Sequence, residues 1–114
     1  MNIRDEIKYG IPPGWWNAFG EQLVKEIEAE VSTWPKESQE EFQLYAKEKF
    51  GSLRIDANIE TENLGKIFDH YDELSTKTCI CCGRPAVWIS RRGWVSPFCD
   101  ECALNTYFTK IEED

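Results

Sequence analysis

Five cysteines lie within residues 79–102, and four of them form two matched pairs. Cys79 and Cys82 make one C-x2-C pair, and Cys99 and Cys102 make a second pair after sixteen intervening residues. Two residues between ligands let both sulfurs of a tight turn point at one ion. Four cysteines in this arrangement are typical of a tetrahedral zinc site. The spacing therefore predicts one bound zinc ion.

Two residues that accompany the first pair fit this interpretation. Gly83 follows Cys82 directly, at a position where a turn that carries two ligands needs a positive φ. Cys81 is the fifth cysteine. If it replaced Cys79 as a ligand, two ligands would be adjacent in sequence and could not easily form the turn. We therefore expect Cys81 to be a spare thiol.

The residues between and after the pairs predict a zinc ribbon. Residues 86–89 and 94–96 are expected to form two short strands, with residues 91–93 in the turn between them. A short helix over about 100–109 should close this module, which would comprise residues 77–114.

The chemistry of this site favours a structural role. A catalytic zinc usually keeps three protein ligands and an open position for water, whereas four thiolates close the coordination shell. The sequence has no His-x-Glu motif of a zinc deaminase and no glycine-rich phosphate loop. Its single histidine, His70, is expected to be a surface residue rather than a ligand. We expect a protein that is not an enzyme.

Two helices are expected before the cysteines. Apolar residues recur every fourth position from Trp15 to Val31, after a segment over residues 11–14 that is expected to be non-helical. This helix should end near Ser32, because the following Trp-Pro pair disfavours helical geometry. A second apolar stripe predicts a helix over about 61–76. The two stripes consist of Trp15, Phe19, Leu23, Ile27 and Val31, and of Leu64, Ile67, Phe68, Tyr71 and Leu74.

The segment between the two helices allows two interpretations. Residues 38–50 have high helix propensity, yet their apolar positions also alternate as in a strand. Apolar residues alternate cleanly over residues 53–59. We predict a hairpin of roughly 41–48 and 52–58.

The expected fold is α+β, in the order helix, hairpin, helix and zinc ribbon. Residues 1–76 would form an acidic α/β core, and residues 77–114 a ribbon module packed on it. Hydrophobic residues make up 41% of the chain and aromatic residues 13%, which is enough for a packed core.

The net charge of −8 is unevenly distributed. Residues 1–76 contain 16 of the 21 acidic residues but only 8 of the 13 basic ones. The acids are densest over residues 21–41, and such a field repels the phosphate backbone. We expect this segment to face water and to bind a protein partner with a basic surface through Glu26, Glu28, Glu30 and Glu37.

Basic residues of the ribbon suggest the alternative of direct contact with nucleic acid. Lys77, Arg84, Arg91 and Arg92 lie near the predicted hairpin and could contact phosphates. Two acidic residues inside the second cysteine pair, and the negative charge of four thiolates on one dication, oppose this contact.

The cellular compartment follows from the termini and the cysteines. No run of eighteen apolar residues is present, and the first ten residues lack the apolar stretch of a signal peptide. We therefore expect a cytoplasmic protein. In a reducing compartment, clustered cysteines are metal ligands more often than disulfides.

Four segments together resemble a known kind of protein. They are Gly-Trp-Trp at residues 14–16, Lys-Glu-Lys-Phe-Gly-Ser-Leu-Arg-Ile at 47–55, Thr-Cys-Ile-Cys-Cys-Gly-Arg-Pro at 78–85, and Gly-Trp-Val-Ser-Pro-Phe-Cys-Asp-Glu-Cys at 93–102. The chain resembles a family of small zinc-binding proteins of phage and bacterial genomes that is functionally uncharacterised. The resemblance implies a β-rich segment before residue 47, which favours the hairpin. It implies no activity.

Two functional hypotheses follow. The first is an immunity protein or phage-encoded inhibitor whose acidic face docks on the basic active-site surface of a nucleic-acid-acting enzyme. The alternative is an adaptor or regulator that uses the zinc ribbon on nucleic acid or the transcription machinery.

Overall fold

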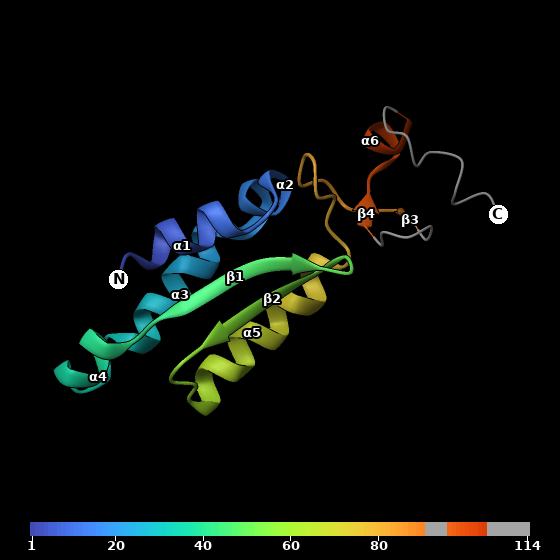
Figure 1. Ribbon diagram of the computed structural model, residues 1–114. Coiled ribbons are helices and arrows are strands. Elements are labelled where there is room, and N and C mark those ends of the chain that lie inside the picture. The colour runs from blue at the N-terminus through green and yellow to red at the C-terminus, as the bar shows by residue number, and fades with distance from the viewer. Residues whose placement is uncertain (91–95, 105–114) are drawn as a thin grey trace.

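The computed structural model describes residues 1–90 and 96–104 (Figure 1). It confirms an α+β fold with a two-stranded antiparallel hairpin and the cysteines near the C-terminal end. The elements are α1 (Ile3–Gly10), α2 (Pro13–Trp15), a π-helical turn η1 (Trp16–Gly20), α3 (Glu21–Val31), α4 (Lys36–Glu41), β1 (Leu44–Lys49), β2 (Ser52–Ala57), α5 (Glu62–Ser75), β3 (Trp88–Ser90), β4 (Ser96–Phe98) and α6 (Asp100–Leu104).

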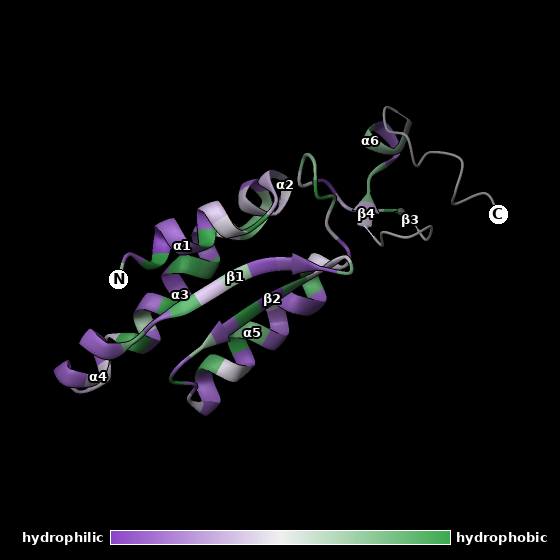
Figure 2. Cartoon of the chain, in the orientation of Figure 1, coloured by the Kyte–Doolittle hydropathy of each residue, from purple (hydrophilic) through white to green (hydrophobic). Residues whose placement is uncertain are grey.

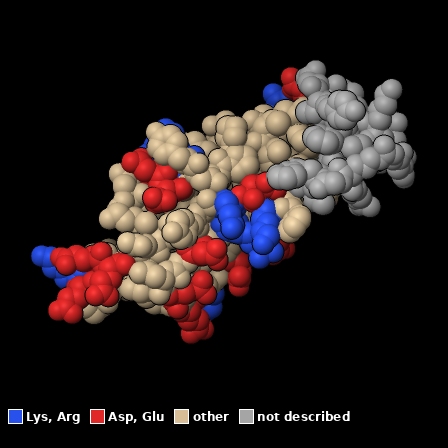
Figure 3. All heavy atoms as spheres, in the orientation of Figure 1, with Lys and Arg blue, Asp and Glu red and all other residues tan. Residues whose placement is uncertain are grey.

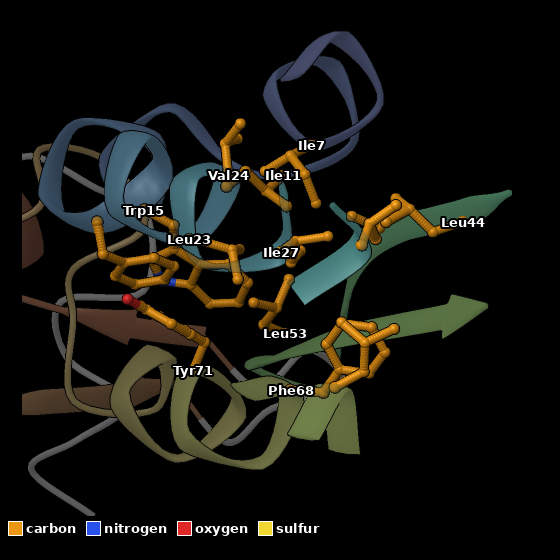
Figure 4. Packing of buried hydrophobic residues seen from close by; sticks show 14 of the residues in the cluster. Ile7, Ile11, Trp15, Leu23, Val24, Ile27, Leu44, Leu53, Phe68 and Tyr71 are labelled. Carbon is orange, nitrogen blue, oxygen red and sulfur yellow. The ribbon is translucent and has the colours of Figure 1, made fainter. Parts of the chain in front are cut away.

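The hairpin β1–β2 lies between the N-terminal helices and α5 (Figure 1). Helix α1 packs on β1, α5 packs on β2, and α3 contacts α5. The core fills the space that these elements enclose, and Figure 4 shows aliphatic side chains of α1 and α3 meeting those of the strands and α5. Its fully buried members include Ile7, Trp15, Leu23, Ile27, Leu44, Leu53 and Leu64.

The expected first helix is present, but it begins earlier than predicted. Helical geometry starts at Pro13, and Gly14 also lies within it, so the prediction of a non-helical segment over residues 11–14 is wrong at these two positions. Proline fits the first position of a helix, where its missing N–H has no partner and its fixed φ is already helical. The helix then continues through the π-helical turn to Val31, and its end near Ser32 is confirmed.

Helix α1 was not predicted. The Asn2 side chain accepts a hydrogen bond from the Asp5 amide (3.0 Å) and caps the helix, whose one buried residue is Ile7. A cap followed by acids in the first turn is a recognised start signal, but the apolar side of this short helix is marked only by Ile3 and Ile7, too few positions for a stripe to be recognised.

The hairpin is confirmed, with its first strand shorter than expected. Strand β1 begins at Leu44 rather than near residue 41, because residues 36–41 form α4, so the helical interpretation holds for that part. Asn58 joins the two regions: its side chain donates to the Glu41 carbonyl (2.7 Å) and accepts from the Gln43 amide (2.8 Å). Helix α4 buries no residue and is hydrophilic throughout (Figure 2).

The second predicted helix is confirmed as α5. Thr61 caps it by accepting a hydrogen bond from the Leu64 amide (3.2 Å), and Leu64, Phe68 and Tyr71 turn inward. Among the residues described, no helix is both long enough and apolar enough to cross a membrane.

Candidate metal centre

The structure brings four cysteine sulfurs together at one point. The Sγ atoms of Cys79, Cys82, Cys99 and Cys102 all lie within 4.8 Å of one another, and those of Cys82 and Cys99 are 3.5 Å apart. Cys79 and Cys99 are buried, whereas Cys82 and Cys102 are half-buried. These are the four residues that the two C-x2-C pairs indicate, and the cluster can hold a metal ion.

The size of the cluster suits a tetrahedral ion. Zinc–thiolate bonds of about 2.3 Å place the sulfurs of a tetrahedral site roughly 3.8 Å apart. The Cys82–Cys99 separation of 3.5 Å is slightly below this value, and no pair of sulfurs in the cluster is more than 4.8 Å apart. Four sulfurs in a tetrahedral arrangement select zinc or iron over the hard cations, which prefer oxygen ligands.

The first cysteine pair lies in a tight loop closed by backbone hydrogen bonds. The Cys79 amide donates to the Arg84 carbonyl (2.8 Å), and the Gly83 amide donates to the Cys79 carbonyl (3.0 Å). Gly83 has a φ of +88°, which an L-residue with a side chain adopts only with strain. The positive φ expected from the sequence is therefore present.

The second pair connects a strand to a helix. Cys99 follows β4 directly, and the Cys102 amide of α6 points at the Cys99 sulfur (3.4 Å). Strand β4 pairs with β3 antiparallel, with Trp88 opposite Phe98. The predicted ribbon hairpin is thus present, but β3 begins two residues later than expected, and β4 extends to Phe98, two residues beyond the expected end. Residues 94–95 of the second predicted strand lie outside the described residues. Residues 91–93 and 105–109, where we expected the turn and the end of the helix, lie outside the described residues.

The first cysteine loop is attached to the start of the long N-terminal helix. The Trp15 indole N–H donates to the Thr78 carbonyl (2.9 Å) inside the protein, and the Gly14 amide donates to the Ile80 carbonyl (2.9 Å). A Cβ on Gly14 would lie 2.2 Å from the Cys79 carbonyl oxygen, so only glycine permits this approach. We interpreted residues 11–14 only as a non-helical segment, and no pattern in the sequence indicated this contact.

The pKa values of the Cys79 and Cys102 thiols are shifted in opposite directions. Burial raises the pKa of Cys79, but backbone hydrogen bonds at Cys99, Cys82 and Cys81 outweigh this effect and lower it to about 6. Burial and the neighbouring thiols raise the pKa of Cys102. One thiolate is therefore favoured before a cation arrives, and a bound dication would displace the protons of the others.

Cys81 and His70 are not members of the cluster of four sulfurs. Cys81 is exposed, and its sulfur does not belong to the group of four. His70 lies on the exposed side of α5, where its ring contacts that of Tyr71 edge-on (centroids 4.9 Å apart). Neither side chain contributes to the candidate centre.

The basic residues of the ribbon are partly neutralised. Arg84 forms an ion pair with Glu101, and Lys77 forms one with Glu73 (3.6 Å). Arg91 and Arg92 lie outside the described residues.

The four glutamates expected to face a partner fall into two groups. Glu28 and Glu37 are exposed, as expected. Glu26 and Glu30 are half-buried, so the expectation that they face water is wrong for both. The Tyr71 hydroxyl donates to Glu26 from α5, and Glu30 accepts hydrogen bonds from Thr61 Oγ1 (2.7 Å), Trp34 Nε1 (3.1 Å) and Asn63 Nδ2 (3.2 Å).

These hydrogen bonds explain why the periodicity of α3 did not predict the partial burial of Glu26 and Glu30. The positions lie at the edge of the apolar stripe, where α5 covers them. The three donors around Glu30 lower the pKa of its carboxyl, with Thr61 having the largest effect. Burial and the hydrogen bond to Glu26 raise the pKa of Tyr71, so the phenol stays protonated and remains a donor.

Comparisons of the chain with models of protein families, with curated protein sequences and with solved structures found no match.

Proposed function

We propose that the four clustered cysteines bind one zinc ion and that the ion has a structural role. The closeness of the four sulfurs supports this proposal. Two of them belong to the loop on α2 and two to the β4–α6 junction, so an ion would join segments seventeen or more residues apart. Four thiolates leave no open position for a substrate or water.

Metal analysis with cysteine variants tests the site. The purified protein should contain one zinc per chain and have no visible absorption, whereas iron–thiolate centres are coloured. Cys99→Ser should lose the metal, and Cys81→Ser should retain it, because the Cys81 sulfur lies outside the cluster. Retention by Cys99→Ser with loss by Cys81→Ser would contradict the ligand assignment, and a coloured iron centre would contradict zinc.

We further propose that the protein is not an enzyme and acts by binding another protein. The observation that supports this is a set of exposed carboxylates on α3 and α4. They form no hydrogen bond or ion pair with any residue described. Figure 3 shows acidic side chains gathered at the end of the molecule that α4 occupies. We call this set the acidic patch, and it comprises Glu28, Glu37, Glu40 and Glu41.

The acidic patch suits a partner with a basic surface. Unpaired carboxylates keep their full charge for a partner, and complementary fields raise association rates at low salt. A nucleic-acid-acting enzyme has a basic surface because it must hold phosphates. The proposed role is therefore that of an immunity protein or phage-encoded inhibitor of such an enzyme. Glu26 and Glu30 contribute to the fold, which leaves Glu28 and Glu37 as the partner-binding residues.

The experiment combines capture with charge reversal. Proteins captured from a host extract are identified, and each captured nucleic-acid-acting enzyme is purified and assayed with and without this protein. We expect inhibition at equimolar concentration. The double variant Glu28→Lys with Glu37→Lys should slow association about tenfold at low salt.

The control is a second double variant, Glu60→Lys with Asp69→Lys. It changes the net charge equally at exposed positions outside α3 and α4. Association should slow less than in the first double variant. Equal slowing by both would show that net charge alone matters, and the absence of inhibition would rule out the inhibitor role.

The alternative, an adaptor that contacts nucleic acid through the ribbon, has less support. Of the four basic residues expected to make that contact, Arg84 and Lys77 are engaged by glutamates. The outward side of the hairpin β1–β2 is a better candidate than the ribbon for contact with nucleic acid, because its basic residues form no ion pair with a described carboxylate.

A further inference from the structure

The outward side of the hairpin β1–β2 combines positive charge with exposed aromatic rings. The antiparallel register sets Tyr45 opposite Asp56, Lys47 opposite Arg54 and Lys49 opposite Ser52. The alternate residues, such as Leu44 and Leu53, are buried. Because side chains alternate across a strand, the register places the first set together on the solvent side. We call Tyr45, Lys47, Lys49, Phe50 and Arg54 the hairpin outer face.

The three cations of this face are not neutralised within the described part of the chain. Lys47, Lys49 and Arg54 are exposed, and none forms an ion pair with a described carboxylate. Nearby carboxylates form no ion pair with these cations among the described residues. Glu48 points to the other side and accepts from the Gly51 amide (2.8 Å), and Asp56 faces Tyr45. Arg54 lines a hollow with the carboxylates Asp56, Glu60, Asp69 and Asp72.

Like charges that lie directly opposite each other destabilise a strand pair. Lys47 and Arg54 lie opposite each other in this hairpin. Two opposed cations are unexpected in a chain with a net charge of −8, in which acidic residues outnumber basic ones. Figure 3 shows basic side chains gathered over the turn end of the hairpin, with acidic side chains around them. The arrangement fits an anion that is supplied from outside.

Two aromatic residues border the cations. Tyr45 is 72% exposed and Phe50 is 71% exposed, so neither contributes to the core. Phe50 occupies the turn with a φ of +53°, which is unfavourable for a bulky L-residue. A glycine would be favoured there for folding alone. The Lys49 ammonium lies 5.8 Å from the Phe50 ring centre, so charge and ring form one surface.

We propose that the hairpin outer face binds single-stranded nucleic acid. The three cations would follow the phosphates, and unpaired bases would stack on Tyr45 and Phe50. Four residues of a strand span about 14 Å, so the face accommodates a few nucleotides. A duplex hides its base faces, and its second strand would approach the acidic side chains that border the hairpin in Figure 3. This inference does not depend on the acidic patch.

The test is oligonucleotide binding by the metal-loaded full chain, measured by fluorescence anisotropy. The probes are a labelled twelve-nucleotide oligothymidylate, a duplex of equal length, and a labelled polyglutamate peptide. We expect binding of the single strand in preference to the duplex and to the peptide. Three phosphate contacts predict that log K falls with log salt at a slope of about −2.

Phe50→Gly separates binding from folding. The variant should bind the single strand at least about fivefold more weakly, because a stacking ring is lost. The same change should raise the thermal midpoint, because glycine adopts the positive φ without strain. Unchanged affinity in Phe50→Gly would overturn the proposal.

Charge variants give the second part of the test. Lys47→Ala should weaken binding and reduce the salt slope by about 0.7. The control Lys36→Ala removes an exposed charge from α4 and should leave both quantities unchanged. Equal effects of the two variants, preference for the duplex, or binding of polyglutamate in place of the oligonucleotide would overturn the proposal. No protein partner enters the assay, so its outcome is separate from that of the inhibitor hypothesis.

Discussion

The N-terminal region and the cysteine region are stabilised by different means. Residues 3–75 bury a continuous cluster of fifteen apolar residues drawn from the helices and the hairpin. Among the residues described in the cysteine region, the buried cluster has four members, Cys79, Phe98, Cys99 and Ala103. Two of these four are candidate metal ligands. A described core this small is typical of a region stabilised by a cross-link or a metal, and we expect the larger region to keep its fold without the metal.

The two regions nevertheless share one junction. Gly14 and Trp15 lie at the start of the long N-terminal helix and form hydrogen bonds with the backbone beside Cys79. The first cysteine loop is therefore held by both the helix and the proposed metal. The following predictions test how far the two regions are separate, from the largest expected effect to the smallest.

Metal removal should have the largest effect. Zinc contributes on the order of 10 kcal/mol to the folding of small zinc modules. Chelation should unfold the cysteine region while the N-terminal region keeps its helices, as measured by amide hydrogen exchange and far-ultraviolet circular dichroism. If equimolar chelator abolishes all helical signal, the regions are a single cooperative unit and the comparison fails.

Leu23→Ala should destabilise the N-terminal region and leave the metal site intact. Leu23 is fully buried, and deletion of its side chain leaves a cavity that costs about 3 kcal/mol of unfolding free energy. The loss should appear in urea denaturation of the metal-loaded protein, and the metal content should not change. Lys25→Ala, on the exposed side of the same helix, is the control and should have little effect.

Gly14→Ala should weaken the junction. Its new Cβ would lie 2.2 Å from the Cys79 carbonyl oxygen, so the cysteine loop must shift, at a cost of about 1–3 kcal/mol. Metal affinity, measured by competition with a chromogenic chelator, should fall together with stability.

Gly65→Ala is the matched control for this junction. It lies within α5, and its Cβ would meet nothing closer than the Glu60 side chain at 3.6 Å. It should stabilise the protein by about 0.5–1 kcal/mol without changing metal affinity. If Gly14→Ala also stabilises the protein, the contact at Gly14 does not constrain the cysteine loop.

Removal of the Glu30 charge should have the smallest effect on the free energy of unfolding. The effect should be confined to the N-terminal region. Its lowered pKa means that it stabilises the fold above the pKa of the unfolded chain, and that this contribution is lost as pH falls through the folded value. Glu30→Gln should therefore be less stable than the parent near neutral pH, and the difference should shrink on acidification.

Unfolding midpoints measured between pH 3 and 7 give this comparison. Glu28→Gln is the control, because Glu28 is exposed and forms no hydrogen bond with a described residue through its carboxylate. Its difference from the parent should vary less with pH. A constant difference for Glu30→Gln across this range would show that the three donors do not act on the charge.

Some features could be predicted because they depend on short-range chemistry. The two C-x2-C pairs identified the four clustered sulfurs, since two residues between ligands suffice to form each half of the site. The apolar stripes identified α3 and α5, since a helix that buries one side repeats every three to four residues. Alternation identified the hairpin, whose second strand begins at Ser52 in the structure, as predicted.

Other features were decided by tertiary structure. Gly14 and Trp15 acquire their role only when residues more than sixty positions later reach them, and no local pattern encodes that approach. Glu26 and Glu30 belong to the polar edge of α3 in the sequence, and residues at the start of α5 and within it make them half-buried hydrogen-bond acceptors.

The hairpin outer face shows both contributions. Alternation predicts the two strands, but their register and the contacts of the inner side with α1 and α5 are seen only in the structure. Three cations without an ion pair among the described residues, and two exposed rings, thereby remain on the solvent side of an acidic chain. The sequence by itself determined the candidate ligands and the periodic elements, because these depend on near neighbours. Tertiary structure decided which polar residues are available to a partner, because burial depends on distant segments.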